Sequence, residues 1–171
     1  MADIVVLVNG IPGAGKTALA AGLASVMSVP VVAKDALKEA LADAAPGAAN
    51  GQLGRIAAEL MWTLAAATPG TVLVDSWWFA PRDRAAAVAD LARCGDATVV
   101  EVWCDVPADV ARERYLARVR HPVHGDPGRL PDAWPRWAAG ARPLGIGTTL
   151  TVRTDRPVDH VALAHEIRAR G

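Results

Sequence analysis

The sequence predicts an α/β fold in which helices cover both faces of a parallel sheet. Short runs of β-branched residues alternate with longer segments rich in Ala and Leu, which is typical of parallel strands joined by crossover helices. The length of 171 residues fits a single domain, and 52% hydrophobic with 21% charged residues is ordinary globular composition. We therefore expect one domain over residues 1–171, built on a five-stranded sheet.

Turn residues divide the chain into elements that alternate along it. Pro107 suits the first turn of a helix, where its missing N–H costs nothing. Strands are expected at 4–9, 29–33, 71–75, 98–104 and 148–153. Helices are expected at about 15–27, 35–44, 53–67, 82–93, 107–120 and 158–170.

Two stretches depart from simple alternation. Residues 36–67 contain two helical segments before the third strand, and residues 121–143 are rich in proline and read as a loop with a short helix. Their positions after the second and fourth strands are where segments covering a ligand site would lie. We expect a substrate-side helical insertion at 36–67 and a lid at about 118–134.

Charge and cysteine content exclude several classes of protein. Eighteen acidic residues balance 18 Lys and Arg, which argues against binding to long nucleic acids. Cys94 and Cys104 are too few for a disulfide framework or a tetrahedral metal site. No run of 18 or more apolar residues occurs, and the N-terminus lacks the basic start of a signal peptide. We expect a soluble, cytoplasmic protein with no membrane partner.

The strongest motif is GIPGAGKT at residues 10–17, which matches G-x-x-x-x-G-K-[ST] between a predicted strand and a predicted helix. Glycines let backbone N–H groups surround phosphate oxygens, and the helix N-terminus favours negative charge. Lys16 would reach the β- and γ-phosphates, and the Thr17 hydroxyl would bind Mg²⁺. The predicted phosphate-binding residues are Gly10, Pro12, Gly13, Ala14, Gly15, Lys16 and Thr17.

With this loop in place, the sequence resembles the small P-loop kinases of nucleotide-kinase-like fold, among them chloramphenicol phosphotransferase and zeta-toxin-like kinases. The resemblance implies a three-layer P-loop NTPase fold with strand order 2-3-1-4-5 and an Arg-rich lid. It implies ATP and Mg²⁺ as cofactors and phosphorylation of a hydroxyl on a small molecule. Beyond the loop it rests on Lys34-Asp35, Val74-Asp75, Cys104-Asp105, Arg112-Glu113 and Arg118-Val119-Arg120.

Two carboxylates are the leading chemical candidates. Asp35 follows the second strand, where the resemblance implies a catalytic base and where an N-cap is the structural alternative. Asp75 ends the third strand, where a carboxylate holds Mg²⁺ in P-loop enzymes, although contact with the acceptor is also open. Asp105 precedes Pro107 closely, so we expect it to cap a helix.

Arginines are concentrated between residues 112 and 142. This stretch contains seven arginines but only three acidic residues, in a chain with no net charge. Arg118 and Arg120 enter the predicted lid, and the resemblance implies that they close over the γ-phosphate, Arg118 also binding the nucleotide. A solvated polar face is the alternative. His121 and His124 are expected to be surface loop residues.

The remaining candidates concern the acceptor and the nucleotide base. Six Trp against one Phe and one Tyr suggest an aromatic pocket, with one of Trp77 and Trp78 packing inward and the other lining it. The predicted acceptor-binding residues are Asp35, Lys38, Trp62, Trp77 and Trp78. In similar kinases the loop after the last strand contacts the base, which implies Arg153 and Pro157.

Three alternatives stay open at this stage. The acceptor could be an antibiotic, a nucleoside or a sugar-like metabolite. A nucleoside or polynucleotide 5′-kinase shares the phosphate loop and an Asp after the second strand. A nucleotide-binding regulatory protein would use the loop without an acceptor base. The sequence decides neither the preference between ATP and GTP nor the oligomeric state.

Overall fold

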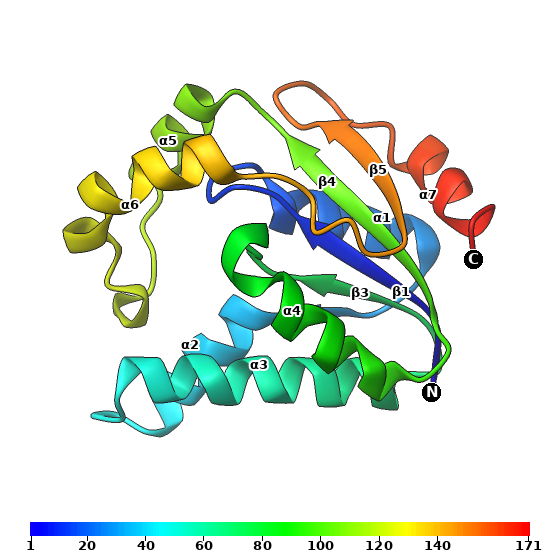
Figure 1. Cartoon of the computed structure of the whole chain (residues 1–171), viewed down its shortest axis with the longest axis horizontal. Helices are drawn as coiled ribbons and strands as arrows, with labels where there is room; N and C mark the ends of the chain where they lie inside the picture. The colour runs from blue at the N-terminus through cyan, green and yellow to red at the C-terminus, as the bar shows by residue number, and fades with distance from the viewer.

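The sheet has five parallel strands in the order β2-β3-β1-β4-β5, as the sequence predicted. The computed structural model describes the backbone of residues 1–171 and the side chains of residues 1–125 and 130–171. Figure 1 shows the strand arrowheads pointing to the same side of the molecule, beyond which α5 and α6 lie. The strands are β1 Ala2–Asn9, β2 Val31–Ala33, β3 Gly70–Asp75, β4 Thr98–Asp105 and β5 Thr148–Arg153.

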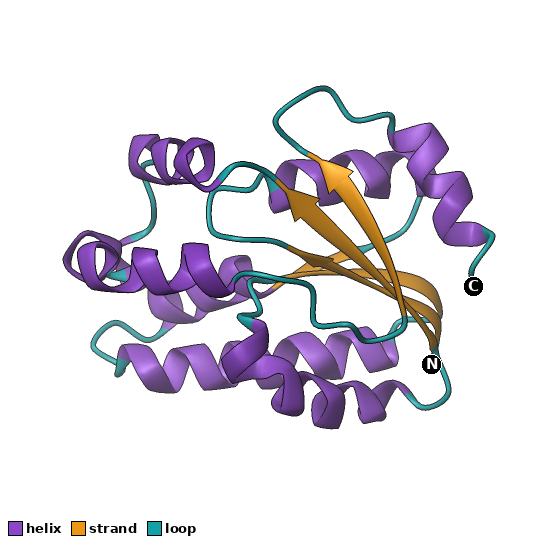
Figure 2. Ribbon diagram, turned by 45° about the horizontal axis from the view of Figure 1, so that its top comes forward, coloured by secondary structure: helices purple, strands orange, loops and turns teal.

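Seven α-helices and two 3₁₀ turns connect the strands. Figure 1 places α3 and α4 on one face of the sheet and α1 with α7 on the other, and Figure 2 shows the strands between these layers. None of the helices, as far as the described residues reach, is long and apolar enough to cross a membrane. The helices are α1 Lys16–Met27, α2 Lys34–Ala44, α3 Asn50–Ala67, α4 Ala80–Leu91, α5 Ala108–Ala117, α6 Asp126–Gly140 and α7 His160–Arg168, with η1 Ala92–Cys94 and η2 Pro122–His124.

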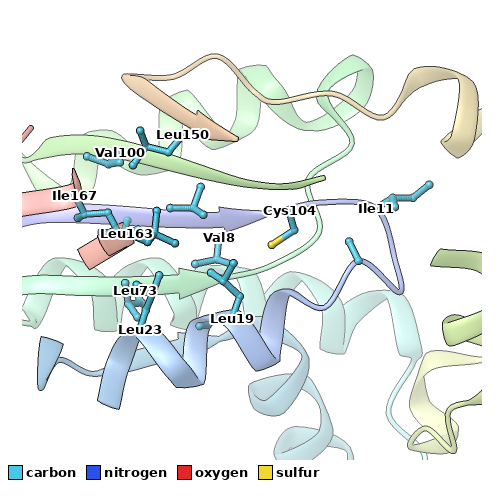
Figure 3. Close-up of a cluster of buried hydrophobic side chains, with 14 of the residues drawn as sticks. Val8, Ile11, Leu19, Leu23, Leu73, Val100, Cys104, Leu150, Leu163 and Ile167 are labelled. Atoms are coloured by element: carbon cyan, nitrogen blue, oxygen red, sulfur yellow. The ribbon is translucent and has the colours of Figure 1, made fainter. Parts of the chain in front are cut away.

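Alternation along the central strands builds two hydrophobic cores. In β1, Val6 and Val8 face the α1–α7 side, and Val5 and Leu7 face the α3–α4 side. All four are fully buried, because helices cover both faces of a parallel sheet. Figure 3 shows the first core, in which Leu19 and Leu23 of α1 meet Leu163 and Ile167 of α7 and the strand residues Val8, Leu73, Val100 and Leu150.

Both cysteines are free and buried, in agreement with the composition. Burial raises the pKa of Cys104 to about 12 and also raises the pKa of Cys94. A thiol with a raised pKa stays protonated at neutral pH and is a poor nucleophile. The two cysteines are therefore core residues rather than reactive groups.

Residues 121–143 were expected to form a loop with a short helix, but the helix is much longer than expected. Residues Asp126–Gly140 form a 15-residue helix, α6, that contains Pro131 and Pro135. Each proline removes one backbone hydrogen bond, but both lie on the exposed side of α6. Leu130 and Trp134 are buried on the other side. Burial of the apolar side of α6 outweighs the cost of the prolines.

Smaller differences concern the ends of elements. The strand expected at 29–33 is shortened to Val31–Ala33, after Pro30. The helix expected at 107–120 ends at Ala117, because Arg118 is in an extended conformation. This early end frees Arg118 and Arg120 from the helix and directs the chain across the edge of the sheet, where the candidate site lies.

Candidate active site

The phosphate loop joins the end of β1 to the start of α1 and packs tightly against its neighbours. Gly13 and Gly15 have φ values of 87° and 84°, which L side chains rarely adopt. A Cβ on Gly13 would also overlap the backbone carbonyl of Ala111 in α5. Glycine at position 13 therefore serves both the turn and the close contact with α5.

Lys16 lies over its own loop. Its Nζ donates to the carbonyl oxygens of Gly10 at 2.9 Å and Ile11 at 3.3 Å. It also lies 5.8 Å from the centroid of the Trp77 ring. Burial lowers the pKa of Lys16 below its ordinary value, and the nearby Asp75 opposes this shift. An ammonium group held by neutral carbonyls is ready to exchange them for phosphate oxygens.

Thr17 and Asp75 form the polar pair at the centre of the site. The Thr17 hydroxyl donates to Asp75 Oδ2 at 2.8 Å, which brings the start of α1 to the end of β3. Burial raises the pKa of Asp75, while Lys16 and the Thr17 hydrogen bond lower it. A hydroxyl and a carboxylate suit Mg²⁺, which takes few protein ligands beside phosphate oxygens and water. Among the described side chains, no cluster of three His, Cys, Asp or Glu forms another metal site.

A cleft of about 950 Å³ opens at this edge of the sheet. Its walls come from the phosphate loop, the start of α2, the end of β3 and the segment after α5. Among the predicted site residues that line it are Pro12, Gly13, Gly15, Lys16, Thr17, Asp35, Lys38, Asp75, Trp77, Arg118 and Arg120. The structure thus brings the predicted phosphate-binding, metal-binding and acceptor-side residues into one cleft.

Asp35 extends into this cleft from the first turn of α2. Its carboxylate accepts from Arg120 Nη2 at 2.7 Å, and its side chain is 63% exposed. The N-cap of α2 is Ala33, and no side chain caps the helix. The structural alternative, that Asp35 is an N-cap, is therefore wrong. The charge of Asp35 acts on both Lys16 and Asp75, so Asp35 lies close to the phosphate loop.

The segment between α5 and α6, residues 118–125, contacts one side of α2 through polar side chains. Besides the Arg120–Asp35 pair, Lys38 Nζ donates to the carbonyl oxygen of Val123 at 3.2 Å. His124 Nε2 lies 2.7 Å from Glu39 Oε1. His121 Nε2 lies 3.0 Å from Asp43 Oδ1. The three carboxylates, at positions 35, 39 and 43, are four residues apart and so share a helix face.

These contacts correct the expectation for the two histidines. His124 is buried rather than a surface residue, and both rings pair with carboxylates of α2. Two further arginines, Arg118 and Arg114, line the cleft in different ways. Arg118 is exposed and lines the cleft. Arg114 also lines the cleft, but its Nη1 donates to the carbonyl oxygen of Thr154 at 3.1 Å.

The tryptophans divide between core and cleft. Trp62 and Trp78 are 1% and 6% exposed, and their rings lie 6.2 Å apart in the core between the sheet, α3 and α4. Neither lines the cleft, so the prediction that they contact the acceptor is corrected by their burial. Trp77 lines the cleft with Trp137 of α6, and the two rings meet edge to face at 6.4 Å. Of the adjacent pair 77 and 78, one packs inward and the other lines the cleft.

Aromatic contacts continue from the cleft along the inner side of α6. Trp137 contacts Trp134, whose ring lies 6.1 Å from the ring of Tyr115 in α5. The Arg120 guanidinium lies 5.5 Å from the centroid of the Tyr115 ring. This aromatic row connects Trp77, beside the phosphate loop, with Arg120, which holds Asp35. No periodic pattern predicts this row, because residues 121–143 are rich in proline and are typical of a loop with a short helix.

The loop after β5 lies beside the phosphate loop, but its predicted base-binding residues lie outside the cleft. Thr154 donates its N–H to the carbonyl oxygen of Asp105 at 2.9 Å, and Thr154 Cβ would be 3.8 Å from a Cβ on Gly15. Arg153 is exposed and pairs with Asp155. Neither Arg153 nor Pro157 lines the cleft. Asp105 caps no helix: α5 begins after Pro107 without a side-chain cap.

Sequence reasoning missed a buried polar network behind the phosphate loop. Glu101 in β4 is fully buried and accepts from Asn9 Nδ2 at 3.0 Å and from the N–H groups of Leu144 and Gly145 at 2.8 and 2.9 Å. Asn9 Oδ1 accepts in turn from the N–H groups of Gly10 and Trp78. The available signal was an acidic residue inside an otherwise apolar strand, since buried polar groups need partners.

The strand order, the loop after β1 and the Thr17–Asp75 pair define a small P-loop kinase fold, a nucleotide-binding class. The chain belongs to the family described as AAA domain, whose family model matches residues 5–141. The resemblance to small P-loop kinases and the expected fold are therefore confirmed. A comparison with curated proteins finds no match.

Solved structures of kinases are similar over almost the whole chain. A candidate kinase from Chloroflexus aurantiacus has a TM-score of 0.79 and 26% identity, covering 98% of this chain and 97% of that one. The tunicamycin resistance protein of Deinococcus radiodurans has a TM-score of 0.60 and 18% identity, covering 99% and 95%. Shikimate kinase from Acinetobacter baumannii has a TM-score of 0.55 and 18% identity, covering 97% and 90%. These similarities show the fold of small kinases and leave the substrate of this chain unspecified.

Proposed function

We propose that this protein transfers the γ-phosphoryl group of ATP to a hydroxyl group of a small molecule, with Mg²⁺ as cofactor. One observation carries the proposal: a single cleft is lined by the phosphate loop, by Asp75 and by Asp35. A nucleotide-binding regulator needs the phosphate loop and a metal-binding carboxylate such as Asp75, but it needs no acceptor base such as Asp35. A carboxylate facing the phosphate loop across a cleft is what an acceptor hydroxyl requires.

The phosphate side of the cleft holds the donor. Backbone N–H groups of Gly13, Gly15, Lys16 and Thr17 and the Lys16 ammonium group would bind phosphate oxygens. Thr17 with Asp75 would hold the metal ion. Mg²⁺ supplies charge neutralisation on the phosphates. Arg118, exposed at the rim of the cleft, adds positive charge where negative charge develops during transfer. The closeness of Thr154 to Gly15 supports a base site at the loop after β5, formed with Arg153 and Pro157.

The acceptor side is formed by α2 and the segment that covers it. Asp35 orients the acceptor hydroxyl and takes its proton as the oxygen bonds to phosphorus, while the bond between that phosphorus and the oxygen bridging to the β-phosphate breaks. Arg120 holds the Asp35 carboxylate at 2.7 Å, which fixes the position of the carboxylate beside the acceptor hydroxyl. Trp77 and Lys38 bound the space beside it.

A product assay tests the proposal directly. Purified protein is incubated with Mg·ATP and panels of antibiotics, sugars, hydroxy acids and nucleosides, and products are identified by mass spectrometry. We expect ADP and a monophosphorylated acceptor in equal amounts. ATP hydrolysis that no acceptor stimulates, with no phosphorylated product across the panels, would favour a regulatory protein and overturn the proposal.

A further inference from the structure

The three lysines of this chain all line the one cleft just described. Lysine is rare here: 15 of the 18 basic side chains are Arg, and these are distributed over the whole molecule. Lys16 belongs to the phosphate loop, but Lys34 and Lys38 stand on α2 beside Asp35. A strongly hydrated ammonium point charge differs from a guanidinium group in what it binds. Its restriction to the cleft indicates a ligand for the lysines on α2.

The position of Lys34 is electrostatically unfavourable in the free protein. It is the first residue of α2, where the positive end of the helix disfavours a cation. It is also four residues from Lys38, and like charges at this spacing repel each other. Lys34 is half-buried, and it has no hydrogen bond or ion pair among the side chains that the structure describes. An anion beside Lys34 would relieve each of these costs.

The charge of the cleft as a whole points the same way. Seven cationic side chains line it, against three carboxylates, in a protein with no net charge. Arg82 is neutralised by Asp83 at 2.6 Å, and Arg120 by Asp35. Lys16 and Arg118 lie where the phosphates of ATP are proposed to bind. These pairings leave Lys34 as positive charge that neither the described side chains nor the nucleotide explains.

We propose that the acceptor is an alcohol carrying an oxyanion group, a carboxylate or a phosphate, which Lys34 binds with Lys38 beside it while the hydroxyl faces Asp35. This inference rests on the proposed function and narrows its substrate class. Lys34 and Asp35 are adjacent on α2, so one small molecule can present its anionic group to the first and its hydroxyl to the second. Neutral alcohols of the same size leave Lys34 without a partner and bind more weakly.

The three lysines allow a test that needs no knowledge of the natural substrate. Protein labelled with ¹³C at the lysine ε-carbons gives three signals, assigned with Lys34→Gln and Lys38→Gln variants. A non-hydrolysable ATP analogue with Mg²⁺ is added first, followed by glycolate, inorganic phosphate or ethylene glycol. We expect Lys16 to respond to the nucleotide, and Lys34 to shift saturably with an anion but not with ethylene glycol. No saturable shift of Lys34 with either anion overturns the inference.

Kinetics provide the second test and separate the two oxyanions. Hydroxy acids are compared with their primary amides, and sugar phosphates with the parent sugars. A charge-assisted contact predicts a preference of about ten- to a hundredfold in kcat/KM for the anionic member of each pair. Lys34→Gln raises the acceptor KM and leaves the ATP KM unchanged, whereas Arg168→Gln on the exposed side of α7 changes neither. Equal or better turnover of the neutral members overturns this inference and leaves the proposed kinase activity intact. If the Lys16 signal does not shift when the ATP analogue is added, the proposed kinase activity itself is contradicted.

Discussion

Asp35 is the residue at which structure and chemistry can be separated most cleanly. It does not cap α2, and its carboxylate faces the cleft paired with Arg120. Asp35→Asn keeps the shape of the side chain but removes the proton acceptor. We expect kcat to fall by about 10²- to 10⁴-fold, the usual contribution of a general base. The ATP KM and the melting temperature should change little.

The matched control for Asp35 is on the same helix. Asp43 also pairs with the covering segment, through His121 at 3.0 Å, but it does not line the cleft. Asp43→Asn therefore removes a comparable surface contact without touching the acceptor site. Steady-state kinetics of both variants decide the matter. An equal loss of kcat in the two would assign Asp35 to docking of the segment rather than to proton transfer.

Lys16 should be required for activity and costly for stability. Because burial holds the pKa of Lys16 below its ordinary value of 10.5, the unfolded chain binds more protons than the folded protein as pH rises towards that value. The stability contributed by Lys16 therefore increases with pH over this interval. Lys16→Met should lose transfer by about 10²- to 10³-fold or more and should lack this rise in stability. Urea unfolding of the wild type and of Lys16→Met at several pH values up to 10.5 measures the difference in their free energies of unfolding. If these free energies change with pH in the same way in both proteins, Lys16 does not cause the rise.

At the scale of elements, α2 and the segment covering it form the least tightly packed part of the site. The side chain of Asp35 is mostly exposed, and no residue of α2 is fully buried. Attachment therefore depends on polar contacts, which contribute modestly when exposed. His124 is the exception, since it is buried against Glu39 at 2.7 Å. The His124–Glu39 contact is the one that should decide how firmly the segment closes.

Glu39→Gln is expected to loosen this segment without unfolding the protein. Loss of a charge-assisted contact should speed hydrogen exchange of the amides of residues 121–125 about tenfold. The amides of α7, on the other face of the sheet from α3, should be unaffected. Hydrogen exchange with mass spectrometry on the two proteins gives the answer, and unchanged exchange at residues 121–125 would show that other contacts hold the segment. Asp43→Asn serves again as the comparison, with a smaller effect expected.

The elements also show where sequence patterns stop being informative. Proline is the strongest local signal for a break, and the pattern of residues 121–143 accordingly predicted a loop with a short helix. The helix forms because Pro131 and Pro135 are four residues apart and share its exposed side, while Trp134 buries the other side against Tyr115. This burial depends on α5, which is remote from the local pattern. Tertiary packing therefore decided the structure of α6.

For the whole molecule, the strands and the phosphate loop were predictable because their signals are local, whereas the strand order was implied by the resemblance to small P-loop kinases. β-branched runs mark the strands, and the spacing of glycines, Lys16 and Thr17 marks the loop. The roles of the tryptophans were not predictable in the same way. The sequence predicted the same role, contact with the acceptor, for Trp62 and Trp77. In the structure Trp62 is 1% exposed in the core, whereas Trp77 lines the cleft. Only the packing of α3 and α6 against the sheet distinguishes them.

Glu101 shows most clearly how one residue can connect the whole molecule, and it carries the last prediction. Through Asn9, Leu144 and Gly145 it connects β4 to the phosphate loop and to the chain that leads from α6 to β5. Glu101→Leu leaves two buried donors, Asn9 Nδ2 and the Leu144 N–H, without a partner, each costing about 1–3 kcal/mol. The third donor, the N–H of Gly145, belongs to an exposed residue. We expect a loss of several kcal/mol in the free energy of unfolding.

A graded series distinguishes this network from general sensitivity of the core. Glu101→Gln keeps one acceptor oxygen and should lose less stability than Glu101→Leu, about 1–3 kcal/mol. Because Asn9 Oδ1 holds the N–H of Gly10, the Gln variant should also raise the ATP KM. Glu113→Leu on the exposed side of α5 is the control and should change neither quantity. Urea unfolding together with ATP kinetics tests the series. Equal stability of Glu101→Leu and the wild type would mean that water or a rearranged backbone satisfies the two buried donors, and Glu101 would then have no part in positioning the phosphate loop.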